Sequence, residues 1–148
     1  MKEPAIDYVL RATWQAVARM YNEQAATYGG SMAIGFVLLN IDRENGTPST
    51  MLAPQMGMEP TSLSRTLKSM EEKGLIIRRP NPDDGRGVLI YLTDFGKQMR
   101  ERSRETVIIF NEAVRAKVSD EKIAHFYEVA DAVNKLVADR EIYNQKQL

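Results

Sequence analysis

The apolar positions near the start of the chain predict a long amphipathic helix over residues 5–28. Its apolar residues recur at steps of three and four, which places them on one face: Ile6, Val9, Leu10, Trp14, Val17, Met20 and Tyr21. Two glycines at 29–30 then favour a non-helical turn. Residues 32–42 are apolar nearly all round, so we expect a second, buried helix that Ser31 caps. Because Gly35 lowers the stability of that helix, we also expect close packing there.

The pattern then predicts two short helices, after a loop over residues 43–48. Ser49 or Thr50 begins the first, and Gly57 ends it. Pro60 stands at the first position of the second, where its fixed φ angle favours a helix. On this second helix Leu63, Leu67 and Met70 share one face. Two short helices joined by a few residues around a glycine indicate a helix-turn-helix.

A β-hairpin follows the second short helix. Residues 75–77 and 88–92 are rich in β-branched and aromatic side chains and predict two strands. Residues 80–87 between them are dense in proline, asparagine, aspartate and glycine, which predicts a polar turn. A helix-turn-helix followed by a hairpin is a winged helix, so the expected fold class is mainly α with a small β-hairpin wing.

Two further helices complete the pattern. Thr93 caps a long helix that turns apolar from Val107 onward, and Ser119 caps a last helix. The apolar face of the last helix comprises Ile123, Phe126, Tyr127, Ala130, Val133, Leu136 and Val137. Amphipathic helices at both ends leave more apolar surface than a central lobe could cover, so we expect a homodimer. The single domain 1–148 would then divide into dimerisation helices, about 1–30 and 107–148, and a winged helix-turn-helix lobe with its connecting helix, about 31–106.

Composition excludes several classes of protein. The chain has 148 residues, of which 43% are hydrophobic and 27% charged, as in ordinary globular proteins. It has no cysteine and one histidine, His125, which argues against thiol chemistry and against a zinc site. The beginning, residues 1–4, does not have the pattern of a signal peptide, and the most apolar run, 32–41, is too short to cross a bilayer. We therefore expect a cytoplasmic protein with no membrane partner.

The positive charge gathers around the second short helix. The chain has no net charge, but residues 61–104 contain ten Lys and Arg against six Asp and Glu. On the helix, the face opposite the leucines carries Thr61, Arg65 and Lys68, flanked by Ser62 and Ser69. Hydroxyls and cations in such a row suit the DNA major groove, where arginine can bind guanine through two hydrogen bonds and lysine can contact phosphate. An ordinary solvated surface helix is the alternative.

The whole arrangement resembles the MarR family of bacterial transcriptional regulators. The resemblance rests on Leu52–Ala53, Gly57, the run from Ser64–Arg65 to Lys73–Gly74–Leu75–Ile76, Arg79, Asp84–Gly85–Arg86 and Leu92–Thr93–Asp94–Phe95–Gly96. It implies a homodimer whose first and last helices interlock. It also implies binding of a pseudo-palindromic DNA operator, usually in repression, and release by a small aromatic or anionic effector.

The resemblance also assigns residues. Residues 61–73 would form the recognition helix and 80–87 the wing tip, with Arg86 in the minor groove and Asp84 orienting it. The expected DNA contacts are Thr61, Ser62, Ser64, Arg65, Lys68 and Ser69 on the helix and Asp84 and Arg86 on the wing. Arg86 paired with Asp84 in a solvated turn is the alternative. The expected effector contacts are Trp14, Tyr21, Met32 and Phe36, which could instead be plain core residues.

Two other functions compete with a DNA-binding regulator. The neutral net charge would suit a winged-helix module that binds proteins without specific DNA binding. An enzyme is disfavoured, because the chain has neither a glycine-rich phosphate loop nor an H-E-x-x-H motif, and its paired acids are adjacent in sequence. No catalytic residue, metal or cofactor is therefore expected.

Overall fold

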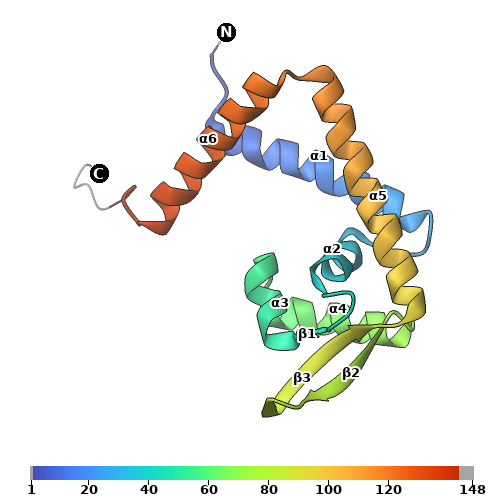
Figure 1. Cartoon of the computed structure of the whole chain (residues 1–148). Coiled ribbons are helices and arrows are strands. Elements are labelled where there is room, and N and C mark those ends of the chain that lie inside the picture. Colours follow the sequence, from blue (N-terminus) through green and yellow to red (C-terminus); the bar gives the residue numbers. More distant parts are fainter. Residues whose placement is uncertain (1, 144–148) are drawn as a thin grey trace. The chain divides into compact units, whose positions relative to one another are not determined.

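The computed structural model describes residues 2–143, which form two compact units. Within them lie the helices α1 (Ile6–Ala26), α2 (Met32–Asn40), α3 (Ser49–Met56), α4 (Pro60–Glu72), α5 (Asp94–Lys117) and α6 (Asp120–Ala138). The strands are β1 (Thr47–Pro48), β2 (Ile76–Asn81) and β3 (Asp84–Leu92). The first unit ends at Val107 and the second begins at Ile108, so their boundary falls inside α5. Figure 1 shows the elements along the chain.

The structure confirms three predicted N-terminal caps, each formed by the hydroxyl group of a serine or threonine. Ser31 Oγ accepts a 3.2 Å hydrogen bond from the N–H of Ile34, at the start of α2. Thr93 Oγ1 accepts one of 3.0 Å from the N–H of Gly96, at the start of α5. Ser119 accepts one of 3.3 Å from the N–H of Lys122, at the start of α6. Each cap satisfies a backbone donor that the first turn of a helix leaves unpaired.

The sheet has a third strand that the sequence did not predict. Residues 43–48 were expected to be a loop, but Thr47 pairs with Ile90 and Pro48 with Leu89 in an antiparallel ladder. The strand order is β1-β3-β2. A two-residue strand is too short to show any alternation of apolar and polar residues, and a proline is tolerated only at such an edge.

The wing is also longer than predicted. The turn was expected over residues 80–87, but β2 continues to Asn81 and β3 begins at Asp84. Asn81 pairs with Asp84 across the tip, and the register shifts between Pro80 and Asn81. Turn-forming residues therefore occupy strand positions, and the hairpin projects past α3 and α4 (Figure 1).

The core of the first unit lies between the helices and the sheet. Val37, Leu38, Leu52, Met70 and Ile90 are almost fully buried there, and they come from α2, α3, α4 and β3. The close packing expected at Gly35 is present, because a β-carbon there would lie 3.2 Å from Ser103 Oγ on α5. This core holds α4 and the wing in place.

The second unit consists of the end of α5 and helix α6. Arg115 joins them, through a 3.6 Å ion pair with Asp120 and a 3.3 Å hydrogen bond to the Tyr127 hydroxyl. Ile123 is buried, but Phe126 is 59% exposed and Val137 61%. The division into dimerisation helices and a central lobe stays a prediction, and residues 1 and 144–148 of those ranges lie outside the described residues.

Candidate nucleic-acid interface

Helix α4 has one buried face and one exposed polar face. Leu63, Leu67 and Met70 are between 0% and 4% exposed and anchor the helix in the core. Of the six residues of α4 predicted to contact DNA, Ser69 is half-buried and the other five are exposed: Thr61, Ser62, Ser64, Arg65 and Lys68. Neither Arg65 nor Lys68 takes part in a salt bridge with another described residue. Both cations are therefore available to an external partner.

Contacts at the C-terminal end of α4 fix its orientation. Glu71 Oε2 lies 2.9 Å from Arg78 Nε on β2, in a charge-assisted hydrogen bond. The Thr93 hydroxyl donates a 2.6 Å hydrogen bond to the carbonyl of Gly74. Lys73 Nζ donates a weaker one, of 3.4 Å, to the carbonyl of Gly29. The end of the helix is thus tied to the wing, to the start of α5 and to the turn after α1.

On the wing, Asp84 contacts the backbone of Arg86 and not its guanidinium group. Asp84 Oδ1 accepts a 3.1 Å hydrogen bond from the backbone N–H of Arg86. No salt bridge of the Arg86 side chain occurs within residues 2–143. Asp84 therefore shapes the backbone at the tip, and the Arg86 side chain is exposed and unpaired.

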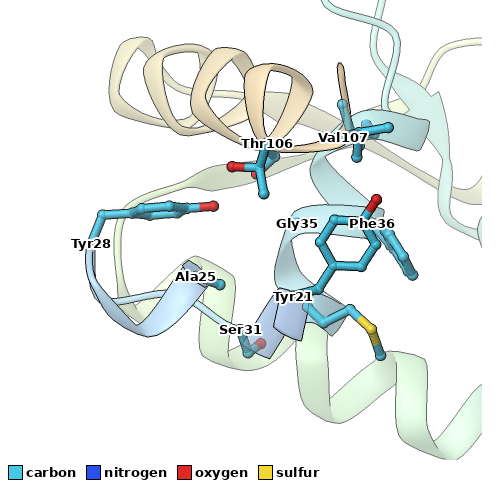
Figure 2. Close-up of a pocket in the computed structure, with 11 residues that line it drawn as sticks. Tyr21, Ala25, Tyr28, Ser31, Gly35, Phe36, Thr106 and Val107 are labelled. Atoms are coloured by element: carbon cyan, nitrogen blue, oxygen red, sulfur yellow. The ribbon is translucent and has the colours of Figure 1, made fainter. Parts of the chain in front are cut away.

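Three of the four predicted effector contacts line one small cavity. Tyr21, Met32 and Phe36 line it. The rings of Tyr21 and Phe36, both labelled in Figure 2, meet edge to face at 5.9 Å. Trp14 lies outside the lining and stacks on Phe36 at 6.5 Å. The cavity holds about 20 Å³, which is room for about one water molecule. Burial raises the pKa of the Tyr21 phenol above its ordinary value.

Other residues of this cavity were not predicted from the sequence. Figure 2 shows Tyr28 and Ser31 near the first two helices and Thr106 and Val107 on α5. The residues on α5 are far from the others in sequence, and no periodic pattern connects them. The residues of α5 join the cavity because α5 packs on α2, where Gly35 allows the close approach.

Comparison with known proteins identifies the fold. A sequence model of the MarR family matches residues 31–88, the region from α2 to the wing. A MarR family transcription regulator of known structure, SP03579, superposes with a TM-score of 0.80 at 20% identity, over 90% of this chain and 88% of that one. The region from α2 to the wing therefore matches the MarR family, and the chain has the fold of MarR-family structures. The transcriptional regulator SlyA is similar in fold, with a TM-score of 0.81 at 19% identity over 93% of this chain and 96% of SlyA.

The curated relatives are also regulators. This chain is 34% identical over 71 residues to the HTH-type transcriptional regulator YdgJ of Bacillus subtilis, and 24% identical over 100 residues to YhbI of the same organism. These alignments cover 48% and 68% of this chain, but only 43% and 65% of the two relatives. As a family, MarR proteins are transcriptional regulators and not enzymes.

The described part of the chain shows neither a metal site nor a membrane-spanning helix. No group of three or more His, Asp or Glu side chains is placed to hold a metal ion in residues 2–143. Nor is any helix there both long and apolar enough to cross a membrane. His125, the single histidine, is exposed on α6.

Proposed function

We propose that this protein binds a pseudo-palindromic DNA operator as a homodimer and represses transcription. The observation that carries the proposal is the exposed face of α4, where Arg65 and Lys68 are unpaired above a fully buried apolar face. A rigid helix with such a face can enter the major groove and read base edges. Arg65 would contact guanine, and Lys68 a phosphate.

Two proteins of similar fold have been solved with DNA, which supports a DNA-binding role. MepR of S. aureus, solved as a DNA complex, superposes with a TM-score of 0.81 at 18% identity over 92% of this chain and 99% of MepR. A cysteine-to-serine mutant of MarR from E. coli, solved with operator DNA, has a TM-score of 0.77 at 23% identity over 86% of this chain and 92% of that one. By this analogy, two copies of the chain would present their α4 helices to half-sites about 34–36 Å apart.

Release by a small molecule is the second part of the proposal. We infer that Tyr21, Met32 and Phe36 contact an effector, with Trp14 supporting Phe36 from outside the cavity. Since ligand pockets usually hold about 300–1,000 Å³, the Phe36 ring would have to move to admit an aromatic compound. A regulator of this kind would act in the cytoplasm, where the chromosome lies.

A binding titration on the DNA upstream of the protein's own gene tests the proposal. Affinity should fall steeply with salt, because bound phosphates release counterions. Replacing Arg65 with alanine should remove the preference for the operator over random DNA, a loss of about 1–3 kcal/mol. Lys122→Ala, an exposed cation on α6, is the matched control and should leave the preference intact. An unchanged preference in Arg65→Ala would show that α4 does not read the bases.

A winged-helix module that binds proteins instead of DNA is the alternative. Its support was the neutral net charge of the chain. The unpaired cations of α4 and the match of residues 31–88 to the MarR family model both favour DNA. If the protein shows no retention on any DNA at low salt, the alternative takes precedence.

A further inference from the structure

The outer part of the wing has no buried side chain, because every residue of the range 77–89 is exposed or half-buried. The last buried residue of β3 is Ile90, which pairs with Arg78 on β2. Strand β1 runs beside β3 only as far as Leu89. A hairpin of two strands alone is only marginally stable in water. The orientation of the tip, which carries Arg86, therefore depends on contacts at the base of the wing.

One polar side-chain contact joins the base of the wing to α4. Glu71 Oε2 on α4 lies 2.9 Å from Arg78 Nε, on the β2 residue opposite Ile90. Among residues 2–143 it is the only ion pair or side-chain hydrogen bond between α4 and the two strands of the hairpin. The apolar residues of the two elements, such as Met70 and Ile76, belong to the core. The pair thus lies where the wing leaves the core.

The exposure of this pair indicates that its main effect is on geometry. The side chain of Arg78 is 38% exposed and that of Glu71 is 49% exposed. Ion pairs with this much exposure contribute little to the stability of a protein. A short hydrogen bond between charged groups is nevertheless directional, and it favours one arrangement of the two elements that carry it.

We propose that Glu71 and Arg78 are positioning residues that hold the wing at a fixed angle to α4. Arg86 then reaches the minor groove while Arg65 lies in the major groove, so the inference rests on the proposed function. Two contacts on one rigid body bind together, because the first contact already places the second near its target. Without the pair, binding would have to order the wing, and Arg86 would contribute less to affinity.

The first measurement uses the full-length protein without DNA. Residual dipolar couplings of backbone amides report the orientation of the wing relative to α4. In the wild type, the couplings of Gly85, Arg86 and α4 should fit one alignment tensor. In Glu71→Ala the wing couplings should depart from the tensor of α4. Glu72→Ala is the matched control, because Glu72 is the next residue, is exposed and forms no ion pair with another described residue.

The second measurement is a double-mutant cycle on an operator with A·T-rich flanks. Arg86→Ala should weaken binding by about tenfold in the wild type and by less than about threefold in the Glu71→Ala background. Arg65→Ala should have the same effect in both backgrounds, because the core holds α4 without help from the wing. In the Glu72→Ala background the effect of Arg86→Ala should remain about tenfold, which controls for the loss of a negative charge.

Exchanging the two charges tests the pair itself. The double variant Glu71→Arg with Arg78→Glu keeps the net charge and can form the pair with the opposite polarity. It should restore the full effect of Arg86→Ala, whereas Arg78→Glu alone, which brings two carboxylates together, should not. A contribution to stability alone would change the unfolding of these variants and leave the effect of Arg86→Ala intact.

Four outcomes would overturn the inference. They are wing couplings that are unchanged in Glu71→Ala, equal effects of Arg86→Ala with and without Glu71, the same loss in Glu72→Ala as in Glu71→Ala, and no recovery in the exchanged pair. In each of these cases an operator preference that depends on Arg65 leaves the proposed function standing. A wild type without any operator preference would refute that function, and the dipolar couplings would still decide whether the pair holds the wing.

Discussion

The carbonyl oxygen of Leu75 occupies the space that the β-carbon of a side chain at Gly96 would need. That carbonyl cannot easily turn away, because it accepts a 3.0 Å hydrogen bond from the N–H of Thr93. The first turn of α5 therefore rests directly on the backbone that joins α4 to β2. This contact fixes the start of α5 relative to the helix-turn-helix and to the wing.

Replacing Gly96 with alanine should destabilise the protein. In an unconstrained helix the same change would stabilise it by up to about 1 kcal/mol, since alanine favours helices. Here the added methyl group would displace α5 or break the Thr93–Leu75 hydrogen bond, and overpacking of this kind costs about 1–3 kcal/mol. Urea unfolding followed by circular dichroism measures the change in the free energy of unfolding.

Gly85→Ala is the matched control for that measurement. Gly85 lies on the wing, and a β-carbon there would meet nothing within 4 Å. Its effect should stay within about 0.5 kcal/mol, as for most surface substitutions. A Gly96→Ala variant as stable as the wild type would show that α5 can shift at its start without cost.

Asp42 should make stability depend on pH in the acid range. Hydrogen bonds from the N–H groups of Asn45 and Glu44 lower its pKa in the folded state from the ordinary 3.8. A group with a lowered folded-state pKa stabilises the fold above its unfolded-state pKa, and this contribution is lost as the pH falls through the folded-state value. Asp42→Asn keeps the acceptor oxygen but removes the charge.

Thermal unfolding of the wild type and of Asp42→Asn, from neutral pH down to about pH 3, tests this linkage. The wild type should be the more stable of the two at neutral pH, and the difference should shrink below about pH 4. A difference that is constant over the whole range would mean that the charge of Asp42 does not contribute to stability.

Much of this fold could be predicted from the sequence, because its elements follow strong local rules. The buried face of α4 shows in the spacing of Leu63, Leu67 and Met70, and the caps show in Ser31, Thr93 and Ser119. Gly35 also predicted close packing at its position, but the sequence did not identify Ser103 as the neighbour. In each case the physical cause involves only a few residues that lie close together in the sequence.

What the sequence did not reveal depends on contacts between distant residues. β1 is defined only by its pairing with β3, and the extended wing by the pairing of Asn81 with Asp84 across turn-forming residues. Arg100 lines a cleft whose walls come from α2, β1, α3 and α5. No periodic pattern in the sequence connects these segments. In the sequence, nothing distinguishes Arg100 from the other cations in the basic part of α5.

Arg86 should contribute to DNA affinity through the minor groove. Its side chain is exposed and unpaired, while Asp84 holds the backbone around it. A narrow minor groove over A·T-rich sequence has an enhanced negative potential that attracts arginine. Arg86→Ala should therefore weaken operator binding chiefly when the flanks are A·T-rich, and much less when they are replaced by G·C-rich flanks.

Footprinting and titration on the two operators measure this contrast. Arg79→Ala, another exposed arginine of the hairpin, serves as the control and should not distinguish the flanks. If the footprint and the affinity of Arg86→Ala match those of the wild type on both operators, the minor-groove role is wrong.

The apolar face of α6 should mediate the proposed homodimer. Val129, seven residues before Leu136 and therefore on the same side of the helix, adds to this face and is 53% exposed within the chain. Leu136 and Val137 extend the exposed apolar surface along the helix. Val129→Asp would place a carboxylate in an interface without a partner, and an unpaired buried charge costs several kcal/mol. Sedimentation velocity over a dilution series should show a dimer for the wild type and a monomer for the variant at the same concentration. Glu128→Gln, at the neighbouring exposed position, should remain dimeric. A dimeric Val129→Asp would place the interface elsewhere, and a monomeric wild type would contradict the homodimer itself.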